Sequence, residues 1–177
     1  MRAAWKLVIG VALAGGAIFG YNALTLNAPV QSRLAGDARN RGVEVWTYHR
    51  YGLVPSQIVF DLRNVSDNNS PLDVTRTLLQ AASALKDRSY DTVYLAWRGQ
   101  ARYVLDGGYF RTLGREFGDQ NPIYTLRTLP ENVRHLNGSQ AFGTWTGGWL
   151  GVTNAQMSDL QRFHEGWFLR DLTGGVR

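Results

Sequence analysis

The chain begins with a hydrophobic stretch that differs from everything after it. Residues 7–24 carry no charged side chain. As a helix they would extend about 27 Å at ~1.5 Å per residue, close to the ~30 Å thickness of a hydrocarbon layer. Trp5 and Tyr21 stand near its two ends, where aromatic rings favour a membrane–water interface. This pattern predicts a membrane anchor over residues 1–26.

The alternative interpretation of this stretch is a cleaved signal peptide, which also has a basic start and a short apolar core. The possible cleavage sites are poor. The bulky Tyr21 stands two residues before Ala23, and Pro29 directly follows Ala28. We therefore expect the segment to be retained as a single-pass anchor in contact with membrane lipid.

Charge predicts the orientation of this anchor. Arg2 and Lys6 precede the apolar stretch, and no basic residue follows it until Arg33. By the positive-inside rule the N-terminus is expected in the cytoplasm and the domain in the periplasm, on a bacterial inner membrane.

Small residues recur every fourth position within the anchor, at Ala12, Gly16 and Gly20. Such a stripe allows two helix backbones to approach closely, which predicts packing against another membrane helix, either of a partner protein or of a second copy. The alternative is that the stripe only reflects the composition of short apolar helices.

The pattern after the anchor predicts an α+β domain. Residues 27–42 are polar and are interpreted as a tether, and residues 43–177 as the domain. Runs rich in β-branched and aromatic residues predict strands, while apolar positions at helical spacing predict helices after Ser70, after Asp106 and from Thr153. We expect a mixed sheet of about five strands with helices over one face. The predicted strands are residues 43–51, 57–65, 92–97, 101–105 and 122–128.

The last predicted helix has a capping-box pattern, in which Thr153 is the cap and Gln156 its partner. Four residues at helical spacing are predicted to form its inner face. They are Met157, Leu160, His164 and Trp167.

Composition excludes several classes of function. The chain has no cysteine, which excludes disulfides and thiolate chemistry. Its net charge is +5, but acidic residues are interspersed among the basic ones, so we do not expect nucleic-acid binding. No glycine-rich nucleotide motif, nucleophile elbow or zinc-protease motif is present, and we expect no cofactor and no metal.

Asp106 is the candidate for catalysis, because it ends a predicted strand and precedes Gly107 and Gly108. A hydrolase could use this carboxylate with a histidine brought near by folding. The alternative is that Asp106 caps the following helix. His164 lies on an apolar helix face, where a buried structural histidine is the simpler interpretation. Whether the chain is an enzyme stays open, with the balance against it.

The segment 142–152, FGTWTGGWLGV, combines aromatic side chains with four glycines. Tryptophan is favoured at binding hot spots because it buries much surface with few rotatable bonds. Trp149, with Trp145 and Phe142, is therefore a candidate partner-binding surface. The alternative places Phe142, Thr144 and Thr146 on one face of a short strand and Trp145 in the core.

The run from Val93 to Val152 contains YVLDGGYFRTLGREFGDQNPIYTLRTLPENVR and AFGTWTGGWLGV. It resembles a group of uncharacterised proteobacterial proteins that have a hydrophobic N-terminus and one small domain. The resemblance implies a bacterial origin and carries over no activity. We expect a membrane-anchored interaction domain, a small subunit or assembly factor of an envelope complex, with an envelope hydrolase as the alternative.

Overall fold

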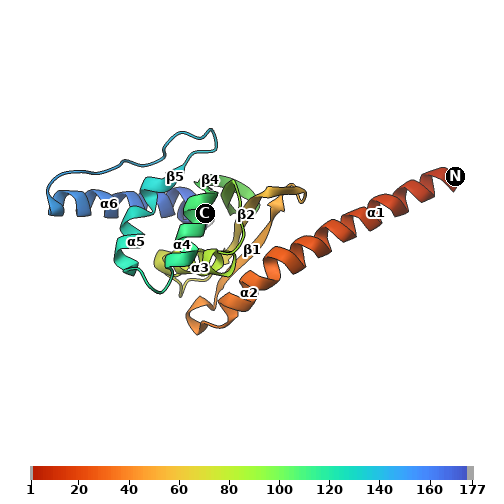
Figure 1. The fold of residues 1–177 in the computed structure, drawn as a ribbon, viewed down its shortest axis with the longest axis horizontal. Coiled ribbons are helices and arrows are strands. Elements are labelled where there is room, and N and C mark those ends of the chain that lie inside the picture. Colours follow the sequence, from red (N-terminus) through yellow and green to blue (C-terminus); the bar gives the residue numbers. More distant parts are fainter. Residues whose placement is uncertain (1, 175–177) are drawn as a thin grey trace.

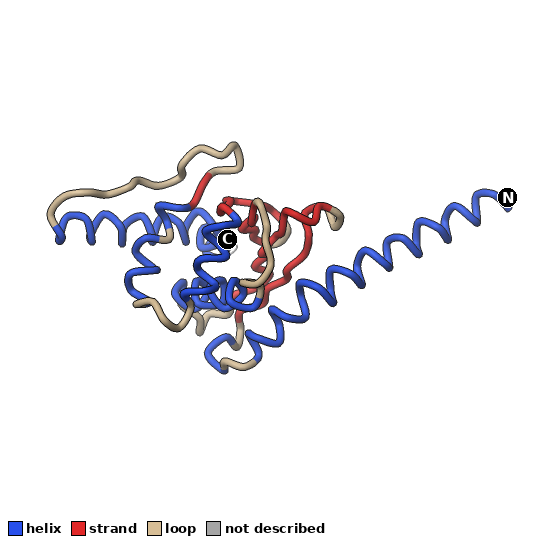
Figure 2. Tube along the Cα trace, viewed as in Figure 1, coloured by secondary structure: helices blue, strands red, loops and turns tan. Residues whose placement is uncertain are grey.

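The structure is a computed structural model that describes residues 2–174, and the side chains of residues 9, 10 and 12–174 apart from Pro122. Its centre is one five-stranded sheet with the strand order β1-β2-β3-β4-β5. The expected mixed α+β fold with a five-stranded sheet is confirmed (Figures 1 and 2). The strands are β1 (Val43–Arg50), β2 (Val54–Val65), β3 (Thr92–Trp97), β4 (Gln100–Asp106) and β5 (Val133–Arg134).

The pairing of the strands follows from their connections. β1 and β2 form an antiparallel hairpin, as do β3 and β4. β2 and β3 are parallel, because helix α3 (Pro71–Ala84) carries the chain back between them. Ser70 and Asp73 form the capping box that begins this helix.

The main core lies on one face of the sheet. Inward residues of the strands, such as Phe60 and Leu95, pack there against α3, α4 (Gly107–Glu116) and α6 (Trp149–His164). The opposite face carries a smaller buried cluster of strand residues. In Figure 2 the strands occupy the side of the domain nearer to α1 (Arg2–Asn22).

The prediction of a strand over residues 122–128 is wrong, because this segment is helix α5 (Pro122–Thr128). Asn121 caps the helix by accepting a hydrogen bond from the Ile123 amide at 3.0 Å, and proline is well suited to the first helical position. These start signals outweigh the apolar run. The fifth strand is β5 instead, and it pairs with β4 in antiparallel fashion.

Helix α6 begins earlier than predicted. Its N-cap is Gly148 rather than Thr153, which lies inside the helix. Leu160, His164 and Trp167 are buried as predicted, Trp167 in the π-helical turn η4 (Glu165–Leu169) that continues the helix, whereas Met157 is 47 % exposed. The inner face runs instead through the residues of α6 that are buried, which are Gln156, Asp159, Leu160, Phe163 and His164.

The segment interpreted as a tether is mostly helical and belongs to the domain. Helix α1 continues through a π-helical turn, η1 (Ala23–Asn27), into α2 (Ala28–Ala35), and a short 3₁₀ turn, η2 (Ala38–Asn40), follows. Leu26, Val30 and Leu34 are all buried in the main core, which explains why this polar stretch packs against the domain.

Helix α1 projects away from the domain as a long rod (Figure 1). Within the described part of the chain, no helix combines the length and the apolar character that a membrane crossing requires. Several residues of the predicted anchor, namely Leu7, Val8 and Val11, lie outside the residues whose side chains are described.

Candidate interaction surfaces

The N-terminal helix is fixed to the sheet through the backbone of the edge strand β1. Edge strands leave N–H and C=O groups without a neighbouring strand. The Asn22 Oδ1 accepts a hydrogen bond from the His49 amide at 2.6 Å, and the Asn22 Nδ2 donates to the Gly52 carbonyl at 3.0 Å. One side chain thus satisfies the end of β1 and the turn that follows it.

Two more amide side chains continue this contact. The Asn27 Oδ1 accepts from the Thr47 amide at 3.2 Å, and the Gln31 Nε2 donates to the Val45 carbonyl at 2.5 Å. We call Asn22, Asn27 and Gln31 the amide row. It binds the edge strand much as a sixth strand would, and it leaves β1 with its backbone groups paired at alternate residues.

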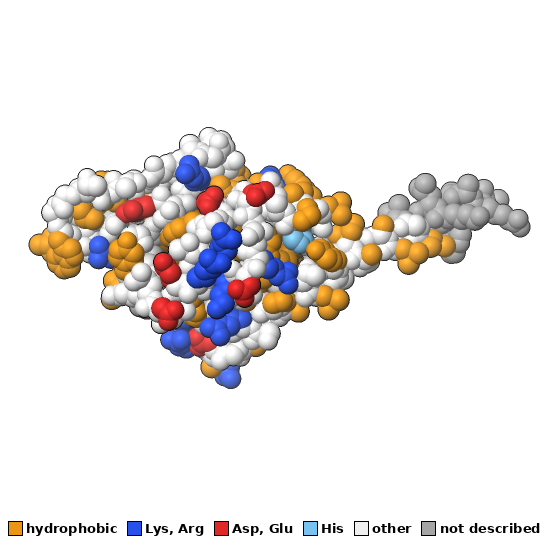
Figure 3. Space-filling model, viewed as in Figure 1, with side chains coloured by type: hydrophobic (Ala, Val, Ile, Leu, Met, Phe, Trp, Pro, Cys, Tyr) orange, Lys and Arg blue, Asp and Glu red, His pale blue; other side chains and the backbone are white. Residues whose placement is uncertain are grey.

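A groove of about 500 Å³ lies where α1 meets β1. One wall is helical and includes Gly15, Ile18, Phe19 and Ala23. The other wall comes from β1, β2 and the turn between them. Figure 3 shows apolar side chains gathered where α1 leaves the domain. The strand wall is formed by Trp46, Thr47, Tyr48, Gly52, Asp61 and Arg63.

The end of the groove nearest the domain is polar. The Arg63 Nη1 lies 2.9 Å from the Asp61 Oδ2, and the Asp61 side chain is 1 % exposed against 36 % for Arg63. The Tyr48 hydroxyl donates to the same carboxylate at 3.2 Å. Burial and this neighbouring carboxylate raise the Tyr48 pKa to about 12, so the phenol stays protonated. The Arg63 guanidinium lies 5.2 Å from the centre of the Trp46 ring. In the ion pair with Asp61, Arg63 is the exposed member.

Thr47 adds an unusual feature to this groove. The residue is 2 % exposed, and among the described residues its hydroxyl finds no hydrogen-bond partner. Buried hydroxyls are normally paired, because burying an unpaired one costs about 1–3 kcal/mol. The hydroxyl is closed to solvent, so a ligand in the groove would reach it only if the surrounding side chains moved.

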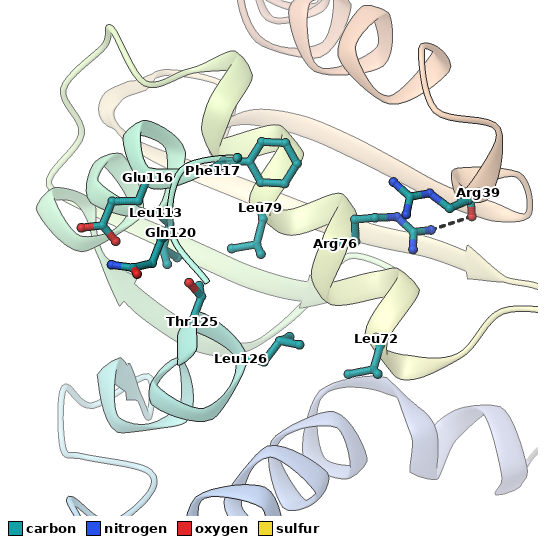
Figure 4. Close-up of a pocket in the computed structure, with 11 residues that line it drawn as sticks. Arg39, Leu72, Arg76, Leu79, Leu113, Glu116, Phe117, Gln120, Thr125 and Leu126 are labelled. Carbon is teal, nitrogen blue, oxygen red and sulfur yellow. Dashed lines mark hydrogen bonds between the residues drawn. The ribbon is translucent and has the colours of Figure 1, made fainter. Parts of the chain in front are cut away.

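A second pocket of about 340 Å³ lies between α3, α4 and α5 (Figure 4). Leu79, Leu113 and Leu126 make it apolar. Arg76 stands at one side, but its guanidinium already donates to the Arg39 carbonyl at 2.8 Å and to the Asp73 carboxylate at 2.8 Å. Arg76 is therefore already paired, whereas Glu116 lines the other side of the pocket.

The predicted packing stripe lies free on α1. Ala12 is exposed, and a side chain added at Gly16 or Gly20 would meet nothing within 4 Å. The stripe is available for another helix, and its role in packing stays a prediction.

The three aromatic side chains of segment 142–152 lie in three different environments. Phe142 packs against Tyr103 and Phe163 at ring-centroid distances of 5.8 and 6.1 Å. The Trp145 Nε1 donates to the buried Asp159 carboxylate at 2.7 Å, while its side chain is 41 % exposed. Trp149 is 70 % exposed at the start of α6. The structure thus places Phe142 against the core and leaves Trp149 free to contact a partner.

Other large apolar side chains on α5 and α6 are exposed as well as Trp149. Leu150 beside it is 69 % exposed, and Ile123 and Tyr124 of the neighbouring helix α5 are 64 % and 53 % exposed. Figure 3 shows apolar side chains at this end of the molecule, far from the free end of α1. We call these four residues the distal patch.

Asp106 caps helix α4, as its alternative interpretation predicts, because its Oδ1 accepts from the Tyr109 amide at 3.0 Å. Packing also explains the glycine at position 107, because a Cβ there would lie 1.8 Å from the Tyr90 carbonyl oxygen. Neither pocket described above is lined by Asp106 or by a histidine. Neither pocket therefore brings Asp106 and a histidine together.

His164 is a buried structural histidine. Its Nε2 lies 2.7 Å from the Thr75 hydroxyl, and the residue is 3 % exposed. Burial lowers the His164 pKa from 6.5 to about 4, so the ring is neutral at physiological pH. Among the described residues, no three histidine, aspartate or glutamate side chains gather to hold a metal ion.

The amide row was not identified from the sequence. Its members are separated by five and then four residues, within a stretch that combines the end of the anchor with the supposed tether. Only Asn27 and Gln31 have the helical spacing of four, so the three residues form no periodic signal that the sequence alone would reveal. Comparison with known proteins adds no further guide, because no family model, no curated protein and no solved structure matches the chain.

Proposed function

We propose that this protein is a membrane-anchored interaction domain of the bacterial envelope, a small subunit or assembly factor of a membrane complex. The observation that carries the proposal is the amide row, which makes the N-terminal helix a rigid extension of the domain. A flexible leader would not need three side chains to fix its far end to the sheet. The uncharged residues 7–24 supply the anchor.

The distal patch supports a role in binding another protein. Monomeric proteins rarely gather large apolar side chains on one exposed surface without a use for it. Trp149 and Tyr124 are of the types that dominate binding hot spots, and both are more than half exposed. A protein anchored at one end and apolar at the other can hold a partner at a fixed distance from the membrane.

The anchor and its orientation are tested by single-cysteine labelling, because the natural chain has no cysteine. Asn137 lies in an exposed loop. Intact cells that carry the Asn137→Cys variant, with a permeabilised outer membrane, are treated with a membrane-impermeant maleimide. We expect labelling without lysis and retention of the protein in membranes after alkaline washing. Mature protein that starts near Gly20 or Pro29, or labelling that needs lysis, would contradict the proposal.

The partner surface is tested by Trp149→Ala in the full chain. We expect weaker co-purification of membrane partners with an unchanged melting temperature. The matched control is Leu136→Ala, since Leu136 is 55 % exposed but lies in the loop before α6. Equal capture by both variants would remove the distal patch from the proposal. A melting temperature that falls only for Trp149→Ala would make this tryptophan a structural residue instead.

A further inference from the structure

The groove between α1 and β1 has the features of a lipid site. We propose that it holds one phospholipid of the surrounding bilayer, with an acyl chain along the helical wall and the phosphate headgroup beside Arg63. This inference rests on the proposed membrane anchor and goes beyond it, because an anchor needs no groove.

The size and chemistry of the groove fit an acyl chain. Its volume of about 500 Å³ lies within the ~300–1,000 Å³ of typical small-molecule sites. Its helical wall runs from Gly15 to Asn27, about 18 Å at ~1.5 Å per residue. Phe19 is 71 % exposed and Trp46 is 54 % exposed, so large apolar side chains stand on both walls.

The direction of the groove fits a lipid in a bilayer. Gly52 of the β1–β2 turn lies against Ile18, while Thr47 lies against Asn27 further along the helix. The turn therefore points toward the N-terminal, membrane end of α1, and the polar end of the groove lies on the domain side. A chain along Gly15 to Ala23 would run into the bilayer as the lipid tails do.

The polar end fits a phosphate headgroup. The Arg63 guanidinium offers five N–H donors, of which the Nη1 group is used by Asp61. Its partner carboxylate is buried, so the member of this ion pair that faces the groove is the cation. Thr47 lines the groove too, but its hydroxyl is closed to solvent, so the headgroup contact rests on Arg63.

The turn between β1 and β2 adds a contact with the bilayer. Tyr51 is 78 % exposed and Leu53 is 65 % exposed, although both lie beside the base of α1. Tyrosine favours the membrane interface, where its ring is apolar and its hydroxyl reaches water. Neither side chain lines the groove, so their contact would be with the bilayer around the bound lipid.

The test uses the full chain in phosphatidylcholine vesicles that contain a phosphatidylglycerol with a diazirine near the ester end of one acyl chain. After illumination, peptide mass spectrometry maps the adducts. We expect adducts on α1 and also on Trp46, Thr47 or Tyr48 of β1. Gly15→Phe should abolish the β1 adducts and retain those on α1, because a side chain at Gly15 enters open space without a clash.

Gly10→Phe is the matched control. Gly10 is also an open position of α1 but does not line the groove, so this variant should keep the β1 adducts. Adducts on α1 but none on β1 would overturn the lipid site and leave the anchor intact. Adducts on β1 that persist in Gly15→Phe would also overturn it, since contact would then not need the groove. The absence of adducts on α1 as well would refute both the anchor and the lipid site.

Discussion

Asn22 offers the sharpest test of how the helix is fixed to the sheet. It is 6 % exposed, and its Oδ1 is the acceptor for the buried His49 amide. Asn22→Ala leaves that amide unpaired, which costs about 1–3 kcal/mol for a buried donor. The Gly52 carbonyl also loses its donor, but it lies in a turn that is partly open to water. We expect a loss of about 2 kcal/mol in the free energy of unfolding.

For a chain of this length, a loss of about 2 kcal/mol lowers the melting temperature by roughly 4–8 °C. The assay is thermal unfolding of the full chain in mild detergent, with hydrogen exchange of the His49 amide as a local readout. Thr25→Ala is the matched control, because the Thr25 hydroxyl donates to the Tyr21 carbonyl in the same turn but is exposed. It should change stability by less than about 0.5 kcal/mol. Equal melting temperatures for the two variants, with unchanged protection of His49, would refute the role given to Asn22.

Two further predictions concern buried groups. The His164 pKa is lowered from 6.5 to about 4, so the unfolded chain binds the proton more readily and stability falls as pH drops from about 6.5 to 4. The loss approaches about 3 kcal/mol at 1.36 kcal/mol per pKa unit, and His164→Gln should flatten this part of a stability curve measured by urea unfolding. Gly107→Ala should destabilise the chain strongly, because its Cβ would meet the Tyr90 backbone. Gly108→Ala should cost less, because its Cβ would meet only the movable Asp106 side chain. Melting temperatures of the two variants compare them directly.

The sequence was sufficient wherever the deciding interaction is local. The helix caps at Ser70 and Asp106 bond to amides three residues away, and both could be identified from residue types at that spacing. The strands β1 to β4 follow from alternation and turns within each hairpin. Asn121 and Pro122 carried the same kind of local signal for α5, and there the apolar run was given too much weight.

The amide row could not be found in this way, because its partners are distant in the sequence. Gln31 and Asn22 reach backbone atoms 14 and 27 residues away. Nothing near residues 27–42 indicates that an edge strand will lie alongside them. The same holds for the groove, whose two walls come from segments that meet only in the folded chain.

The π-helical turn η1 explains how one continuous helix can both bind the edge strand β1 and extend away from the domain as α1. In a regular α-helix, residues five apart such as Asn22 and Asn27 would point about 140° apart, because each residue turns ~100°. The wider i→i+5 turn brings both onto the face that meets β1, and Gln31 then follows at the ordinary spacing of four. The buried Leu26 and Val30 keep the same relation on the adjacent face. The extra residue therefore aligns the amide row with the edge strand while the helix continues unbroken into α1. Because Asn22 and Asn27 both bond to β1 and line the groove, the width of the groove and the position of the N-terminal helix are fixed together.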